Sequence, residues 1–575
     1  MNNYVKYIEN RMSDDEKEML KKIYSPTVVA TPLADSRRDV CVLPSGEIRA
    51  YSEYHPIAGR SGDIPRGTYL SSVDGGLSWS TKYSKGIVHS CSYFEEPDIY
   101  LAVDESDGLC VYRSKIGPDD EAPEIIRLAE KSEGFHCSFL PQKSDFCDRV
   151  WFTSEIGDRA FFFFSDDWGK SWERREIAPI KPFETVFPHK GTRWCVESGR
   201  EPYAIELSEG KMMMILRTPL DCFYLSYSYD RGNSWTEPEE SIFYGTDTTA
   251  FLLRLSDERI ITFWNNTRPL PEPNHNATLP PVGDHVKKGF GEDAFTNRDA
   301  AHAAISEDGG ESFIGFREII LNPIRNNADF RHAGDVRTSL DKSVHQFQAF
   351  ELPFNKVLVS AGQNSASRRL LIFDVNWLYE TSRKEDFLGG LGNITAHTYI
   401  KSVSDSHAWR LGNGHCAWNR AMSAYPMPDP DGEPSEALLI SKHHDERLIN
   451  DIGGATWNFP ASPRGRVDIV TRVIEKQARF ILSDRWFNTC DRYAHILSPF
   501  FFEISKEDVG DRFFTLSIIY DTVAGRADVL VNGERIFSLK MSRSAPTGLS
   551  YLIMQCDTDG DSKGFYVRSL EKTTL

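Results

Sequence analysis

The side chains with the clearest chemical potential stand at the ends of short apolar runs. Arg37 and Arg38 precede the run that starts at Val40, and Arg217 closes a run of methionine, isoleucine and leucine. A planar guanidinium meets a carboxylate with two parallel hydrogen bonds, so arginines in such places suit an acidic ligand. Glu201 adds a carboxyl group for proton transfer. Residues of these types can hold an acidic group and move a proton beside it.

Three histidines open strand-like segments: His89, His136 and His345. The stretches His89-Ser-Cys-Ser and His136-Cys-Ser resemble each other. Imidazole serves as acid, base or metal ligand near neutral pH. One histidine in such a place is usually structural, but three at corresponding places favour a shared functional role.

The elements that must position these residues carry an internal repeat. Four segments share a serine, an aspartate two residues on, a glycine two further and an aromatic residue three beyond; they are residues 72–79, 165–172, 228–235 and 306–313. In such a turn the aspartate accepts backbone N–H groups, the glycine takes the left-handed conformation, and the aromatic ring packs between neighbouring units. Four copies with one internal spacing predict a repeat architecture.

This pattern is the Asp-box, and the chain resembles the six-bladed sialidase-like β-propellers. The resemblance implies an all-β protein. The N-terminal residues 1–25 have the pattern of a short amphipathic helix, with Ser13 as its N-cap ahead of three acidic residues. The propeller would occupy residues 26–385, with residues 27–31 completing the last blade. Alternating strands after residue 386, such as residues 514–521 and 529–534, resemble a concanavalin- or laminin-G-like β-sandwich of the jelly-roll, lectin-like kind, spanning 386–575.

The resemblance also implies roles for particular residues. Arg38, with Arg37 as the near alternative, and Arg217 would clamp a substrate carboxylate, while His89, His136 and Gln346 would line the same channel. Glu201 would act as base or polarise the nucleophile. Asp63, with Glu53 as runner-up, would be the acid. The third clamp would be one of Arg298, Arg325, Arg331 and Arg337. A long insertion at about residues 268–298 would form a lid or wall beside the site.

The chain departs from the family at one position. The tyrosine nucleophile of sialidases aligns with Gln346, beside His345, and a neutral amide cannot replace a phenolate. We therefore expect no true sialidase but an exo-acting glycoside hydrolase that removes a terminal, acidic sugar. Glu201 or His345 would activate water, which permits inversion. Two alternatives remain open: a lyase on uronates that uses the channel histidines, and a glycan-binding protein without catalysis.

Composition narrows the class of partner. The 575 residues include 66 basic and 84 acidic side chains, a formal charge of -18, which argues against nucleic acid and anionic membranes as the main partner. The partner that the resemblance implies is a glycan. The ten cysteines form no CxxC pair, which disfavours a zinc knuckle and suits free thiols. The N-terminus lacks a secretory signal, so we expect a cytoplasmic protein unless a leader was removed. The chemistry requires no cofactor, although a structural Ca²⁺ in the sandwich is compatible with the sequence; the oligomeric state stays open.

Overall fold

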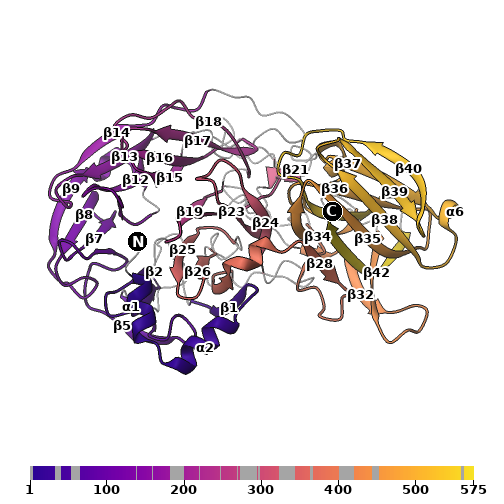
Figure 1. Ribbon diagram of the computed structural model, residues 1–575, viewed down its shortest axis with the longest axis horizontal. Helices are drawn as coiled ribbons and strands as arrows, with labels where there is room; N and C mark the ends of the chain where they lie inside the picture. Colours follow the sequence, from indigo (N-terminus) through magenta and orange to yellow (C-terminus); the bar gives the residue numbers. More distant parts are fainter. Residues whose placement is uncertain are drawn as a thin grey trace, which may run out of the picture.

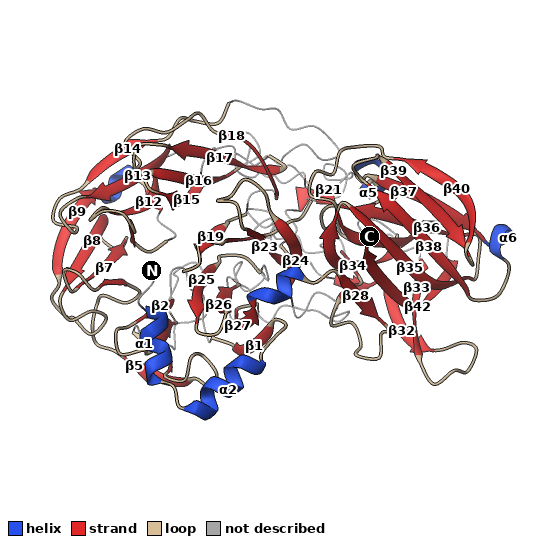
Figure 2. Cartoon of the chain, viewed as in Figure 1, coloured by secondary structure: helices blue, strands red, loops and turns tan. Residues whose placement is uncertain are grey.

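The structure is a computed structural model, and it describes residues 4–32, 40–52, 65, 67–136, 139–157, 159–181, 200–218, 220–245, 248–268, 270–271, 294–295, 298–322, 344–362, 367–399, 420–442, 452–557 and 562–575. These residues form a ring of small sheets beside a pair of larger sheets (Figures 1 and 2). The predicted all-β class is confirmed. None of the helices within these ranges is long and apolar enough to cross a membrane.

Small antiparallel sheets make up the ring, each with four strands in its main path. The first sheet contains β2 (Val40–Val42), β3 (Ile48–Tyr51), β4 (Thr68–Ser72) and β5 (Ser80–Tyr83). The second sheet contains β6 (Ser92–Phe94), β7 (Ile99–Asp104), β8 (Leu109–Ser114) and β9 (Glu124–Ala129). The third sheet contains β10 (Phe135–His136), β12 (Val150–Ile156), β13 (Arg159–Ser165) and β14 (Glu173–Glu176), and β11 (Gln142–Lys143) also pairs with β12. The fourth sheet contains β15 (Arg200–Ser208), β16 (Lys211–Arg217), β17 (Cys222–Ser228) and β18 (Glu239–Tyr244). The fifth sheet contains β19 (Phe251–Arg254), β20 (Ile260–Trp264), β23 (Ala300–Ser306) and β24 (Ile314–Leu321). The sixth sheet contains β25 (Gln348–Leu352), β26 (Lys356–Ala361), β27 (Arg369–Asp374) and β1 (Thr27–Ala30). We number these sheets as blades 1 to 6 in this order.

The strand that completes blade 6 comes from the N-terminal end of the chain, as the sequence predicts. β1 pairs antiparallel with β27, and Val28 lies opposite Leu371. Pairing the two ends of the ring in one sheet removes the exposed edges that an open array of sheets would leave.

The Asp-box turns have the geometry that their sequence predicts. In the third box, Gly232 adopts φ 85° and donates its N–H to Ser228 Oγ at 2.8 Å. Asp230 Oδ1 accepts the Ser234 N–H at 2.8 Å. The Trp235 indole donates to the Gly232 carbonyl at 3.2 Å, and its ring lies 5.2 Å from that of Phe162 in blade 3. Each box therefore closes its own turn and also packs against the preceding blade.

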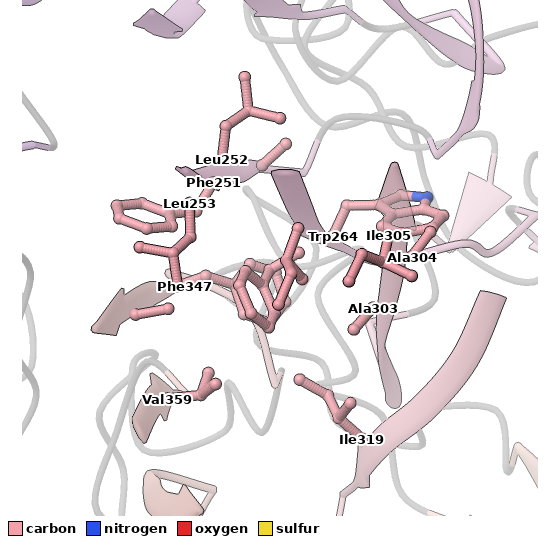
Figure 3. Close-up of a cluster of buried hydrophobic side chains, with 14 of the residues drawn as sticks. Phe251, Leu252, Leu253, Trp264, Ala303, Ala304, Ile305, Ile319, Phe347 and Val359 are labelled. Atoms are coloured by element: carbon pink, nitrogen blue, oxygen red, sulfur yellow. The ribbon is translucent and has the colours of Figure 1, made fainter. Parts of the chain in front are cut away.

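Apolar side chains from successive blades form continuous cores between the sheets. The largest core joins blades 4, 5 and 6 and includes the fully buried Ile261, Phe263 and Trp264 of β20. Figure 3 shows Trp264 among side chains of blade 5, with Phe347 and Val359 of blade 6 nearby. β20 and β23 are buried along their whole length, which explains their nearly continuous apolar sequences.

The N-terminal segment folds as two helices, where the sequence predicts one. α1 (Tyr4–Arg11) ends before Ser13, whose side chain caps α2 (Asp14–Lys22) in a capping box with Glu16. Ser13 was expected as a cap; because a cap residue is extended, it also interrupts the helix. Ile8 and Leu20 bury against residues of blades 1 and 6.

The C-terminal residues form two stacked sheets around a common core. One contains β28 (Ser382–Glu385), β32 (Ala424–Pro428), β33 (Glu436–Lys442), β35 (Arg464–Val473), β38 (Phe514–Asp521), β39 (Arg526–Val531), β40 (Glu534–Lys540) and β42 (Ser562–Thr574). The other contains β29 (Ile394–Thr395), β34 (Gly453–Ser462), β36 (Gln477–Ser483), β37 (Phe500–Ser505) and β41 (Leu549–Cys556). Trp457, Phe480, Leu516 and Phe565 meet in that core. β28 pairs with β42 and so belongs to the first of these sheets.

Candidate functional site

The carboxylate of Glu201 is the point where three blades meet. Its side chain is 4% exposed and lies at the start of β15 in blade 4. Oε1 accepts from His136 Nε2 of blade 3 at 3.2 Å and from Gln346 Nε2, just before blade 6, at 3.3 Å. Oε2 accepts from the guanidinium of Arg217, at the end of β16. Four residues that the sequence singled out therefore form one cluster.

The backbone at Glu201 is held in an unusual conformation. Its φ is 44°, in the left-handed region that non-glycine residues seldom occupy. The Glu201 N–H donates to Glu155 Oε2 at 3.1 Å, and Glu155 lies opposite His136 in the pairing of β10 with β12. Such strain persists only where the surroundings fix it, and it gathers at functional sites.

Gln346 is fixed in the same manner. Its φ is 62°, and its N–H donates to Thr249 Oγ1 at 3.1 Å. The structure thus places this side chain on Glu201, at the position where the sequence resemblance put the tyrosine. The amide donates to the carboxylate, but it offers no nucleophilic oxygen.

His136 connects the buried carboxylate to the accessible side of the cluster. Its Nδ1 lies 3.7 Å from Oε1 of Glu105, which directly follows β7 in blade 2. The side chains of His136 and Glu105 are 19% and 23% exposed. His136 therefore contacts the buried carboxylate of Glu201 on one side and the carboxylate of Glu105 on the other.

His345 and His89 are buried and do not belong to the chain of contacts formed by Glu201, His136 and Glu105. His345 is 1% exposed, and its Nε2 accepts from Arg298 at 2.8 Å. Arg298, one of the candidates for the third clamp, is likewise 1% exposed. The His89 ring stacks on Tyr51 with centroids 5.2 Å apart, and its Nε2 lies 3.0 Å from the Gly86 carbonyl oxygen. Both histidines are packed as parts of the blades.

Several predicted site residues lie outside the described residues: Arg37, Arg38, Glu53, Asp63, Arg325, Arg331 and Arg337. Most of the insertion at about residues 268–298 also lies outside them; within it, β21 (Leu270–Pro271) pairs with β22 (Ala294–Phe295). In the part of the chain that is described, no three His, Cys, Asp or Glu side chains form a group that could hold a metal ion.

Two site residues escaped the sequence reading: Glu105 and Glu155. Glu155 is a carboxylate inside an otherwise buried strand, which is an unusual place for a charge and could have marked it. Glu105 follows an apolar run within a polar stretch and carries no such signal. Only the folded chain brings it to His136.

The comparisons with known proteins agree with the Asp-box pattern. Residues 139–321 match the BNR repeat-like domain, and this segment contains three of the four Asp-boxes. The match confirms the BNR-repeat, or Asp-box, resemblance over these residues. The search of curated proteins gave no significant match.

Solved structures that align with the chain do so at low identity. A mutant of Trypanosoma rangeli sialidase displaying trans-sialidase activity is 10% identical, with 96% of this chain and 95% of that chain covered and a TM-score of 0.33. A protein of unknown function from Dyadobacter fermentans is 16% identical, with coverages of 61% and 99% and a TM-score of 0.36. The NanB sialidase from Streptococcus pneumoniae is 12% identical, with coverages of 62% and 56% and a TM-score of 0.31. Similarity at this level assigns no activity.

Proposed function

We propose that this Asp-box propeller is a glycoside hydrolase that removes a terminal, acidic sugar from an oligosaccharide. The observation that carries the proposal is the convergence of His136, Arg217 and Gln346 on the carboxylate of Glu201. Such a buried and fully engaged carboxylate, on a strained backbone at the meeting of three blades, is typical of a site built for chemistry.

Hydrolysis without a tyrosine requires water as the nucleophile. Gln346 holds the tyrosine position and cannot form a glycosyl intermediate. Direct attack by water, with a carboxylic acid protonating the leaving oxygen, gives an inverted product. Asp63, or Glu53 in its place, is the sequence candidate for that acid. Arg38, Arg37 and Arg337 are the candidates for binding the sugar carboxylate, because Arg217 is engaged with Glu201.

The test begins with a screen of the purified chain against aryl glycosides of acidic and neutral sugars and against oligosaccharides with acidic ends. We expect turnover of acidic substrates and a loss of about 100-fold or more in Glu201→Gln. The matched control is Glu206→Gln, a buried carboxylate on the same strand that binds Ser144 Oγ at 2.8 Å. Equal activity of the Glu201 and Glu206 variants would contradict the proposal.

The same screen separates the two alternatives. A lyase acting on uronates leaves an unsaturated sugar that absorbs in the ultraviolet, whereas a hydrolase leaves none. A binding protein would retain the acidic oligosaccharide without releasing product. Either result would replace the proposed hydrolase.

A further inference from the structure

We infer that Cys41 and Cys91 form a redox pair, which hydrogen peroxide converts into a disulfide that links blades 1 and 2. Cys41 is the middle residue of β2, and Cys91 directly precedes β6, so each lies on or beside the first strand of its blade. Both are free thiols in the structure. This modification site lies outside the cluster around Glu201 and is independent of the proposed hydrolase function.

The two cysteines lie against each other in one buried cluster. Cys41 is 1% exposed and Cys91 is 2% exposed, and both pack with Tyr51 and Val88 between the first two blades. The thiol and the backbone N–H of Cys91 both donate hydrogen bonds to the sulfur of Cys41. Two cysteines form a disulfide only where their side chains already face each other at short range, and this contact meets that condition.

The contact makes the two thiols unequal. The hydrogen bond from Cys91 lowers the pKa of the Cys41 thiol. Arg49, which pairs with Glu47 and Asp119, lies opposite Cys41 across β2 and β3, and its charge also favours the thiolate. Burial and the hydrogen bond to Cys41 raise the pKa of Cys91 well above its ordinary value. Because peroxide oxidises the thiolate, Cys41 reacts first and Cys91 waits beside it as a thiol.

The reaction consumes one peroxide for each disulfide. The thiolate sulfur of Cys41 attacks one oxygen of hydrogen peroxide, the O–O bond breaks, and Cys41 becomes a sulfenic acid. The hydroxide that leaves takes up the proton given up by Cys41 and becomes water. The sulfur of Cys91 then attacks the sulfenic sulfur, the S–O bond breaks, and the oxygen leaves as a second water with the thiol proton of Cys91. Two thiols are oxidised by two electrons in total, and peroxide is reduced by two.

Burial selects the oxidant by its size. At 1% and 2% exposure, the two cysteines are closed to glutathione and to the thiols of other proteins while the chain is folded. Hydrogen peroxide is hardly larger than water, so local fluctuations of the two blades suffice to admit it. Peroxide is therefore the oxidant that suits this pair.

The disulfide fastens β2 to blade 2, as hydrogen bonds already fasten it to blade 6. Val40, next to Cys41, donates its N–H to Gln348 Oε1 at 2.9 Å, and its carbonyl accepts from Gln348 Nε2 at 2.8 Å. A covalent bond between residues 41 and 91 restricts the unfolded chain, which loses conformational entropy. We therefore expect the oxidised chain to unfold at a higher urea concentration than the reduced chain.

The experiment treats the reduced full-length chain with hydrogen peroxide, blocks the remaining thiols with iodoacetamide in denaturant, and maps the tryptic peptides by mass spectrometry. Cys41 lies in the peptide of residues 39–49, and Cys91 lies in that of residues 86–113, which also contains Cys110. We expect the two peptides to be joined, with the mass of two hydrogen atoms lost from their sum. The matched control is Cys110→Ser, which should form the same link. Cys110 belongs to the same buried cluster, but its thiol donates to the Asp107 carbonyl at 3.8 Å.

Two further variants test the roles of the pair. In Cys91→Ala, peroxide should add oxygen to Cys41, form no link and leave the urea midpoint unraised. In Cys41→Ala, Cys91 should remain a thiol that iodoacetamide blocks. A wild-type chain in which both thiols are still blocked after peroxide would overturn the inference, and so would a link from Cys41 to another cysteine. The wild-type peptides decide the inference even where a variant fails to fold.

Discussion

Two residues of the site have backbones that only their surroundings can hold. Glu201 and Gln346 both take positive φ, and each uses a backbone N–H to bind a side chain, Glu155 and Thr249 respectively. Their side chains then meet at 3.3 Å. The cost of two left-handed residues, about 1–2 kcal/mol each, is accepted where it fixes a carboxylate and its donor.

Substitution of Gln346 should separate stability from activity. Gln346→Ala removes the amide donor from Glu201 but keeps the strained φ, whereas Gln346→Gly removes both. We expect both variants to lose about 10-fold or more in turnover of an acidic glycoside. The glycine variant should be more stable than the alanine variant by about 1 kcal/mol in urea unfolding, because glycine adopts positive φ readily. Equal stability would show that the backbone at this position carries no strain.

At the scale of the element, the Asp-box turn is an autonomous unit repeated around the ring. In the fourth box, Asp308 Oδ1 accepts from Ser306 Oγ at 2.7 Å and from the Ser312 N–H at 2.9 Å. The bonds from Ser312 lower the pKa of Asp308 to about 2. A folded-state pKa below the ordinary 3.8 means that the turn gains stability above about pH 3.8 and loses it as pH falls towards 2.

The Asp308→Ala variant tests this turn. It should lower the free energy of unfolding by about 1–2 kcal/mol at neutral pH, because several backbone and hydroxyl donors lose their acceptor. Glu311→Ala, in the same exposed turn, is the control, since Glu311 contributes only its N–H to Asp308. Activity should change in neither variant, because the turn belongs to the periphery of the blade. Equal unfolding free energies of the two variants would contradict the role given to Asp308.

At the scale of the whole molecule, the ring and the C-terminal sheets share a buried polar interface. The Asn266 N–H donates to His302 Nδ1 at 3.0 Å, so His302 donates from Nε2 to Tyr551 of β41. Tyr551 in turn donates to Glu318 Oε1 at 2.8 Å. Backbone bonds of 2.9 Å join Trp486 to Asn266 and Arg268 beside this network. These hydrogen bonds join the two parts of the chain.

Burial makes this interface sensitive to acid. It lowers the pKa of His302 to about 3, against an ordinary value of 6.5. The unfolded chain therefore binds a proton at this histidine before the folded chain does, and stability falls as pH drops from about 6.5 towards 3, by up to about 1.4 kcal/mol per pH unit. His302→Gln keeps an acceptor and a donor but cannot titrate. Its unfolding free energy, measured in urea at several pH values, should fall less steeply than that of the wild type; an unchanged slope would contradict the assignment.

Local chemistry explains which parts of the fold were predictable. The Asp-boxes and the Ser13 cap depend on residues close together in sequence, so their pattern reveals them. The closing strand β1 pairs with the distant β27, and it was expected from the propeller resemblance. The break between α1 and α2 at Ser13 and the pairing of β28 with β42 were not predicted from the sequence. Such boundaries are decided by packing.

The sequence by itself determined the repeat, the all-β class, and the residues Glu201, Arg217 and Gln346, because each belongs to a short motif with a fixed place in a blade. Only the tertiary structure decided which of three similar histidines faces the site. His136 meets Glu201, whereas His345 packs on Arg298 and His89 on Tyr51. Glu105, from yet another blade, joins His136 for the same reason: the contacts of a ring centre come from strands far apart in the chain, and no local pattern encodes them.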